Sequence, residues 1–151
     1  MASTTIEQVR EYFQNEYDRI TGDWYANDPS FLPASISVEL GVTAGCYSFK
    51  ENKMMLFVGE HNLEDFERVF KGEQWSGSKL GWFANQSEFI HELLHEFQHK
   101  GIEHVTEVGR ALFIKYRHRH PDPGHGDVWF TAIAEKAPYF RVTPDELYLE
   151  L

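Results

Sequence analysis

The chain is nearly free of cysteine, since Cys46 is the only one among its 151 residues. A lone cysteine excludes an intramolecular disulfide, a cysteine-rich zinc site and a C-x-x-C redox pair. Free cysteine behaves as a small apolar side chain, so we expect Cys46 to be buried. Any metal site in this chain must therefore be built from other ligands.

Long apolar runs are also missing. No stretch approaches the ~20 apolar residues that a membrane-spanning helix needs. Residues 1–7 contain no basic stretch followed by an apolar core, which a secretory signal would have. We therefore expect a cytoplasmic chain with no membrane partner.

Basic residues are in the minority, with 14 against 24 acidic ones and a formal net charge of −10. This balance disfavours nucleic acid as a partner, because it repels a phosphate backbone unless the cations gather on one face. One basic cluster, Lys115 to His120, is present. Such a run is typical of a solvated helix end, so His118 and His120 are expected to be surface residues.

Aromatic residues, in contrast, make up 15% of the chain, and hydrophobic residues make up 42%. This composition favours a packed globule, and the length fits one domain, residues 1–151. Hydrophobic periodicity predicts an α+β fold in which a small three-stranded antiparallel sheet packs against helices. The expected helices are 6–20, 63–70, 85–100, about 105–117, 127–136 and a short one from 144, and the expected strands are 36–42, 45–49 and 53–58.

Polar residues mark several of these helix starts. Thr4 with Glu7, and Thr143 with Glu146, have the spacing of a capping box. Asn85 stands directly before the apolar pattern of the helix 85–100 and is its expected N-cap.

That helix carries the sequence His91-Glu92-Leu93-Leu94-His95, an H-E-x-x-H string. Histidines four residues apart lie on one helical face, ~6 Å apart along the axis, so both imidazoles can reach one ion. Glu92 stands where a general base for a metal-held water is needed. The string indicates a zinc hydrolase, with this helix at the centre of the fold.

A catalytic zinc needs a third protein ligand, and His125 is the favoured candidate. Gly124 and Gly126 flank it, and glycine allows the backbone to turn sharply toward a metal. His99 continues the four-residue spacing, but on an unbroken helix it lies ~12 Å from His91 and cannot share its ion.

Other third ligands remain open. Glu103 or Glu107 could supply a carboxylate if the chain reverses at Gly101, as in sites with two histidines and a glutamate. His104 lies so close to the end of the metal helix that it would require a tighter reversal.

The H-E-x-x-H helix, followed by His125-Gly126-Asp127-Val128-Trp129-Phe130, resembles the SprT-like zinc metalloproteases. The resemblance covers roughly residues 38–137. It implies a zincin-like, gluzincin-type core and a zinc site that His125 completes. Two features depart from the family: the long gap before His125 implies a helical insertion near 103–120, and the cysteine-rich zinc ribbon of many members is absent. The repair of DNA–protein crosslinks therefore does not carry over.

These patterns predict a zinc-dependent metallopeptidase with His91, His95 and His125 as ligands and Glu92 as general base. Its partner would be a protein or peptide substrate, and the strand 53–58 is a candidate sheet edge for binding it. Three alternatives stay open. They are a zinc amidase or peptidoglycan hydrolase, an acidic binding protein with a structural metal site, and a nucleic-acid-associated protease that uses the Lys115 to His120 cluster.

Overall fold

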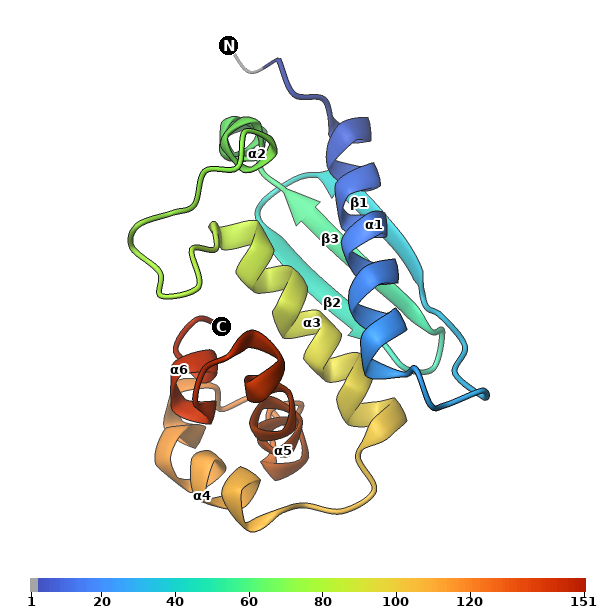
Figure 1. Cartoon of the computed structure of the whole chain (residues 1–151), viewed down its shortest axis with the longest axis vertical. Helices are drawn as coiled ribbons and strands as arrows, with labels where there is room; N and C mark the ends of the chain where they lie inside the picture. The colour runs from blue at the N-terminus through green and yellow to red at the C-terminus, as the bar shows by residue number, and fades with distance from the viewer. Residues whose placement is uncertain (1–2) are drawn as a thin grey trace.

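The computed structural model describes residues 3–151 of the chain. Over these residues it contains six α-helices, three short 3₁₀ helices and one three-stranded sheet (Figure 1). The prediction of an α+β fold is confirmed. The elements are α1 (Ile6–Trp24), β1 (Ser35–Leu40), β2 (Ala44–Ser48), β3 (Lys53–Val58), η1 (Glu60–Asn62), α2 (Leu63–Phe70), α3 (Ala84–Gly101), α4 (Glu107–Tyr116), η2 (Arg117–Arg119), α5 (Asp127–Lys136), η3 (Ala137–Phe140) and α6 (Pro144–Tyr148).

The sheet is mixed, with the strand order β1-β3-β2. β2 and β3 form an antiparallel hairpin in which Tyr47 pairs with Met54, whereas β1 runs parallel to β3 and Val38 pairs with Leu56. The prediction of an all-antiparallel sheet is therefore wrong for β1. The chain reverses direction twice between β1 and β3, so these two strands point the same way and pair. β3 is consequently the central strand, and residues 53–58 do not form the expected edge.

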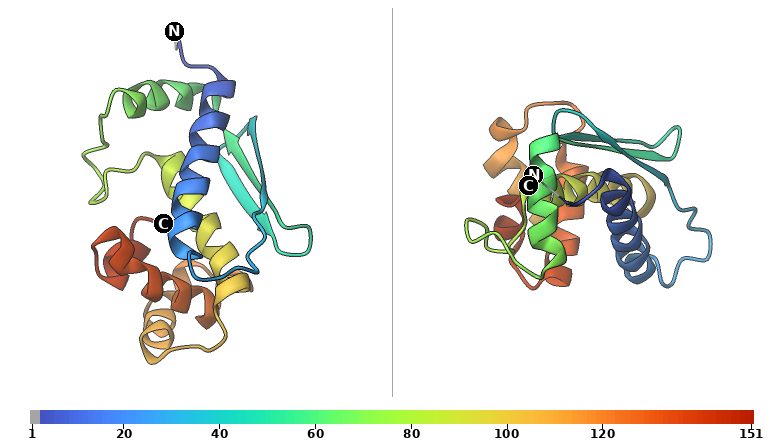
Figure 2. Two further views of the ribbon diagram at one scale, coloured as in Figure 1. Left: turned by 45° about the vertical axis from the view of Figure 1, so that its right-hand side comes forward. Right: turned by 90° about the horizontal axis from the view of Figure 1, so that it is seen from above.

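One face of the sheet is covered by helices. α1 and α3 lie side by side on that face (Figure 2). Burial alternates along β3, where Met54, Leu56 and Val58 are buried and the residues between them are only partly so. This two-residue period places the apolar side chains of the central strand against the helices.

α3 occupies the middle of the molecule, as the sequence predicts for the metal helix. The sheet lies on one of its sides, and the cluster of α4, α5 and α6 lies on the other (Figure 1). Leu93 and Leu94 are fully buried on this helix, and Phe89, Ile90 and Phe97 are nearly so. A helix that is apolar on several faces is stable only when it is covered from several directions, which explains why this segment became the core helix.

Two of the predicted helix caps are wrong. Thr5, rather than Thr4, caps α1, and it forms a capping box with Gln8 instead of Glu7. α3 begins one residue before Asn85, which is buried and donates from its side chain to the Phe57 carbonyl at 3.2 Å. Asn85 therefore ties α3 to the end of β3 instead of capping the helix. The predicted box of Thr143 and Glu146 is confirmed at the start of α6.

A buried polar network joins α1 to α3. Glu96 is fully buried, and its Oε2 accepts hydrogen bonds from the Tyr17 hydroxyl at 2.6 Å and the Lys100 ammonium at 2.7 Å. The Tyr17 oxygen in turn accepts from the backbone N–H of Ala34 at 2.7 Å. A buried carboxylate is tolerated when it is paired in this way. The network fixes the helix beside His95.

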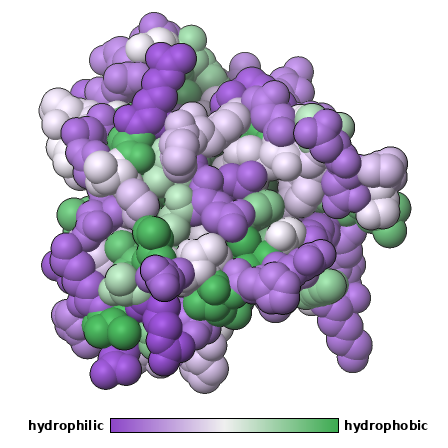
Figure 3. Space-filling view, turned by 60° about the horizontal axis from the view of Figure 1, so that its bottom comes forward, coloured by the Kyte–Doolittle hydropathy of each residue, from purple (hydrophilic) through white to green (hydrophobic). Residues whose placement is uncertain are grey.

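The surface is mostly hydrophilic on the face shown in Figure 3, where hydrophobic residues form separate patches. Within residues 3–151, no helix has the length and apolar character needed to cross a bilayer. Cys46 is exposed on β2, so the prediction of a buried thiol is wrong. β2 is an edge strand whose residue 46 points away from the covering helices, and nothing in the local apolar pattern of 45–49 indicates this.

Candidate metal centre

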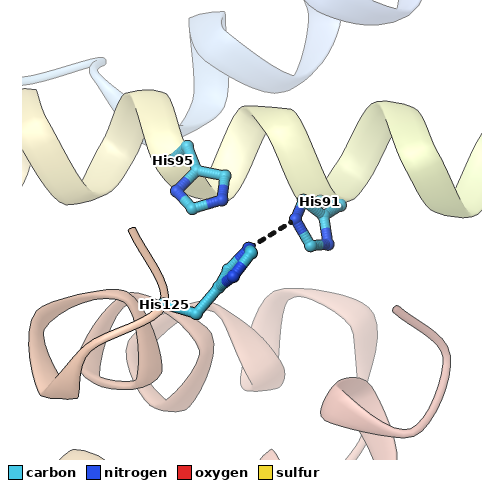
Figure 4. A group of neighbouring side chains, drawn as sticks. All are labelled: His91, His95 and His125. Atoms are coloured by element: carbon cyan, nitrogen blue, oxygen red, sulfur yellow. Dashed lines mark hydrogen bonds between the residues drawn. The ribbon is translucent and has the colours of Figure 1, made fainter. Parts of the chain in front are cut away.

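Three histidines from two distant segments meet beside α3. His91 and His95 project from α3, and His125 reaches them from the loop that precedes α5 (Figure 4). One ligand nitrogen from each lies within 4.8 Å of the others. The three ring centroids are 5.0, 5.0 and 4.9 Å apart, which is nearly an equilateral triangle. The prediction that these three side chains converge is confirmed.

The donor set fits a metal ion. The Nε2 atoms of His91 and His125 face each other at 3.0 Å. Two nitrogens bound to a tetrahedral zinc at 2.0–2.1 Å would be roughly 3.3 Å apart, close to the observed separation. The Nδ1 atom of His95 lies 2.9 Å from Oε1 of Gln98, an acceptor only, so Nδ1 carries the proton and Nε2 is free to bind.

All three imidazoles are held in the neutral form that metal binding requires. Burial, with contributions from the neighbouring imidazoles, lowers the pKa of His91 to about 3. Burial lowers the pKa of His95 to about 4. Burial and the nearby His120 also lower the pKa of His125.

Trp129 forms the floor of the cluster. Its side chain is fully buried on α5, and its ring centroid lies 4.8, 5.2 and 4.5 Å from those of His91, His95 and His125. The His95 ring stacks on it at an interplanar angle of 16°. An aromatic side chain in contact with all three imidazoles limits their rotamers and excludes water from one side of the cluster.

The glycines that flank His125 do not make the sharp turn that the sequence predicts for them. Neither Gly124 nor Gly126 has a positive φ, and a Cβ added at either would meet no atom within 4 Å. A short turn places His125 instead, with its backbone N–H donating to the Asp122 carbonyl at 3.0 Å. His125 does lie beside His91 and His95, but the predicted reason, a sharp turn at the flanking glycines, was wrong.

Glu92 lies on α3 directly after His91 and is 4% exposed. Burial, together with the side chain of Glu88 one helical turn earlier, raises the pKa of Glu92 to about 9. Gly45 of β2 packs directly on these two side chains: a Cβ there would lie 2.9 Å from Oε1 of Glu88 and 3.1 Å from Cγ of Glu92. The edge strand therefore closes over the candidate general base.

The alternative ligands do not join the cluster. Glu103, His104 and Glu107 are exposed and are not among the side chains that converge. His99 is exposed and packs its ring on Phe49, with the centroids 5.0 Å apart, at the far end of the β2–β3 hairpin. The segment 103–120, where a helical insertion is expected, holds α4 and η2.

The basic cluster Lys115 to His120 divides into two parts. Lys115 pairs with Asp145 at 2.6 Å, and the Arg119 guanidinium lies 5.9 Å from the Tyr116 ring centroid. His120 turns inward, and its ring lies 5.0 Å from that of His125. The prediction of a surface position for His120 therefore holds only in part, because its side chain is partly exposed but packs beside the three histidines. The sequence held one usable signal, a second histidine five residues before His125 and in the same loop.

Comparison with known proteins identifies no relative of this chain. No family model matches the chain, and neither a curated protein nor a solved structure gives a significant match.

Proposed function

We propose that the chain is a zinc-dependent metallopeptidase of the SprT-like type, with a zincin-like arrangement of helix and sheet. The observation that carries this proposal is the convergence of His125 on His91 and His95, across 34 residues of sequence, beside the buried carboxyl group of Glu92. Two ligands and a general base on one helix, with a third ligand from a later loop, match what a hydrolytic zinc site requires.

The donor set favours a catalytic zinc over a structural one. Structural sites close the ion with four protein ligands, whereas three histidines leave one tetrahedral position open. Zinc bound there would supply Lewis acidity, which lowers the pKa of a water that it holds and withdraws electrons from a substrate carbonyl.

Glu92 moves the proton in this reaction. Its carboxylate accepts a proton from the attacking water as the water oxygen bonds to the carbonyl carbon. It then gives the proton to the amide nitrogen as the C–N bond breaks, so that one water is consumed and an acid and an amine are released. Burial raises the pKa of Glu92, and a dication beside it favours the ionised form that this role needs.

An extended peptide fits the edge of the sheet beside α3. β2 pairs with β3 alone among the strands of residues 3–151, so its other edge is available for a further strand. Gly45 places this strand against Glu92. A peptide that adds to β2 would lie along the same helix as the proposed catalytic groups.

Metal analysis combined with a cleavage screen tests this function. We expect one zinc per chain and cleavage of a broad peptide library by the wild-type protein. Glu92→Gln should keep the zinc and lose activity by about 10²–10⁴-fold. A variant that binds zinc and cleaves as well as the wild type would overturn the peptidase role and favour a structural metal site.

The ligand set has its own control variants. His125→Ala should lose zinc, whereas Glu103→Ala and Glu107→Ala should keep it, because these carboxylates lie outside the cluster. The opposite pattern would remove His125 from the site.

A further inference from the structure

His120 lies beside the metal centre without being part of the ligand set. It follows η2, and its ring centroid lies 5.0 Å from that of His125 and 5.8 Å from that of His91. Its side chain is partly exposed. The residue therefore borders the side of the histidine triangle that joins His91 and His125.

The hydrogen bonding of His120 separates it from the ligands. Its Nδ1 lies 2.6 Å from the Tyr148 hydroxyl, which occupies that nitrogen. Within residues 3–151, Nε2 makes no hydrogen bond, and His120 is absent from the set of converging ligand atoms. The ring therefore presents one unused nitrogen beside the site.

Tyr148 is held rigidly. It is 2% exposed on α6, and its ring stacks on Tyr116 at 4.3 Å and on Phe130 at 5.3 Å. Burial raises the pKa of its hydroxyl group, which therefore keeps its proton. The hydroxyl has no acceptor other than His120 in the described part of the chain, so we assign it as the donor to Nδ1.

This hydrogen bond fixes the tautomer of the imidazole. A neutral ring that accepts at Nδ1 carries its hydrogen on Nε2. The result is a single N–H donor of fixed direction at the border of the metal centre. Donors fixed before the reaction are effective at stabilising negative charge that develops on a carbonyl oxygen.

We propose that His120 donates a hydrogen bond from Nε2 to the substrate carbonyl oxygen as that oxygen becomes negatively charged, and that Tyr148 is the positioning residue that holds the ring. The assignment rests on the proposed peptidase function. It names a second proton-donating group, distinct from Glu92, which acts on the water and on the leaving nitrogen.

The test measures zinc content and cleavage of fluorescence-quenched casein by the full chain. His120→Ala should keep one zinc per chain and lower kcat by about 10²–10³-fold with little change in KM, as for the loss of an oxyanion donor. His120→Gln, whose amide N–H can replace the Nε2 donor, should recover part of kcat. Tyr148→Phe keeps the aromatic stack and should lower kcat less than His120→Ala does.

Matched controls separate this role from folding. His118→Ala removes an exposed histidine of the same segment, and Tyr139→Phe removes a hydroxyl that bonds to Asp23 at 2.6 Å, away from the site. Both should cleave casein at the wild-type rate. If His120→Ala does not fold, His120→Gln and Tyr148→Phe test the proposal, because each of them nearly preserves the size of the side chain that it replaces.

The outcomes distinguish two failures. Loss of zinc in His120→Ala would make the residue a ligand and overturn the proposal. Wild-type kcat in all three variants, with Glu92→Gln inactive, would overturn the role of His120 and leave the peptidase function standing. Absence of wild-type cleavage, or full activity of Glu92→Gln, would overturn the proposed function and this inference with it.

Discussion

The three imidazoles differ in what restrains their second nitrogen. His95 is oriented by Gln98, whereas Nδ1 of His91 and Nδ1 of His125 are buried without a hydrogen-bond partner among residues 3–151. Asp122 lies 4.0 Å from Nδ1 of His125, beyond hydrogen-bond distance. Partners of this kind fix the tautomer and raise the basicity of a ligand. The ring of His95 is therefore better oriented for metal binding than the rings of His91 and His125.

Removing this restraint should weaken metal binding without removing a ligand. Gln98→Ala frees the His95 ring, and we expect zinc affinity to fall by about 10–100-fold, the usual effect of losing such a partner. Competition with a chromogenic chelator measures it. Gln14→Ala, on the exposed face of α1, is the matched control. Unchanged affinity in Gln98→Ala would show that packing on Trp129 alone orients His95.

A second prediction concerns the close approach of β2 to Glu92. In Gly45→Ala the new methyl group would lie 2.9 Å from Glu88 and 3.1 Å from Glu92, so at least one carboxyl group must move. We expect kcat to fall by roughly 10–100-fold while zinc affinity is kept, because displacement of a catalytic group is costly even when small. Steady-state kinetics and metal analysis of the same preparation check this.

The control for that variant is Gly22→Ala. An added methyl group at this position of α1 meets no atom within 4 Å, and alanine favours a helix by up to about 1 kcal/mol. It should leave kcat unchanged. If Gly45→Ala were equally active, the strand would have enough freedom to move away from α3, and the tight packing would have no role in catalysis.

At the scale of elements, local patterns predicted the helices well. The helix 127–136 was predicted with the boundaries that the structure has, and the apolar period from Leu63 to Phe70 with the stop at Gly72 located α2. Helix α1 extends four residues past its predicted end, since Gly22 does not interrupt it. A glycine near a helix end is a weak stop signal when the following turn still packs on the core.

The pairing of the strands was harder to predict from the sequence than the helices were. The parallel pairing of β1 with β3 depends on a chain path that skips β2, and a two-residue period carries no information on the neighbour of a strand. The same limit explains why the sequence did not reveal the position of His120. Its neighbours in sequence are basic and exposed, whereas its role depends on Tyr148, 28 residues later. The local string identified the two candidate ligands on α3, but only the fold brings His120 and Tyr148 together.

Helix α6 carries Tyr148, and its first turn offers a test of how it is anchored. Oε1 of Glu146 accepts from the Thr143 N–H at 3.0 Å, and its carboxylate forms an ion pair with Lys79. The hydrogen bond from Lys79, followed by the one from Thr143, lowers the pKa of Glu146 to about 2. The folded chain therefore binds this proton less readily than the unfolded chain does.

The sign of the pH dependence follows from this shift. The contribution of Glu146 to stability is present above the ordinary carboxyl pKa of about 4.5 and is lost as the pH falls through about 2. Glu146→Gln should lower the melting temperature modestly at pH 7, and the gap to the wild type should narrow below pH ~4.5. Thermal unfolding from pH 7 to pH 3 measures it. Glu11→Gln, an exposed position on α1, should show no such gap.

At the scale of the whole molecule, the metal centre lies between two groups of elements. α1, the sheet and α3 form one, and α4, α5 and α6 form the other (Figure 1). His91 and His95 belong to the first group, and His125 enters from the second. A bound ion would connect the two groups by coordinate bonds, in addition to the packing of α3 on α5. Metal binding should therefore stabilise the C-terminal helices in particular.

Hydrogen exchange with and without a chelator tests this connection. At a free zinc concentration 100 times Kd, binding stabilises the folded chain by about 2.7 kcal/mol, which should raise Tm by roughly 5–10 °C for a chain of this size. We expect removal of zinc to accelerate exchange most in α5 and α6 and least in β3 and α1. Exchange in β3 should change little because the buried side chains of this strand include none of the three histidines.

His125→Ala supplies the matched control, because it keeps both histidines of α3 and removes the one ligand that spans the two groups. Zinc should then leave exchange in α5 and α6 unchanged, even where His91 and His95 still bind it weakly. If zinc protected these helices equally in His125→Ala and in the wild type, the ion would act through α3 alone. If chelation accelerated exchange to the same extent in β3 and α6, the site would stabilise the chain as one cooperative unit and not by joining two parts.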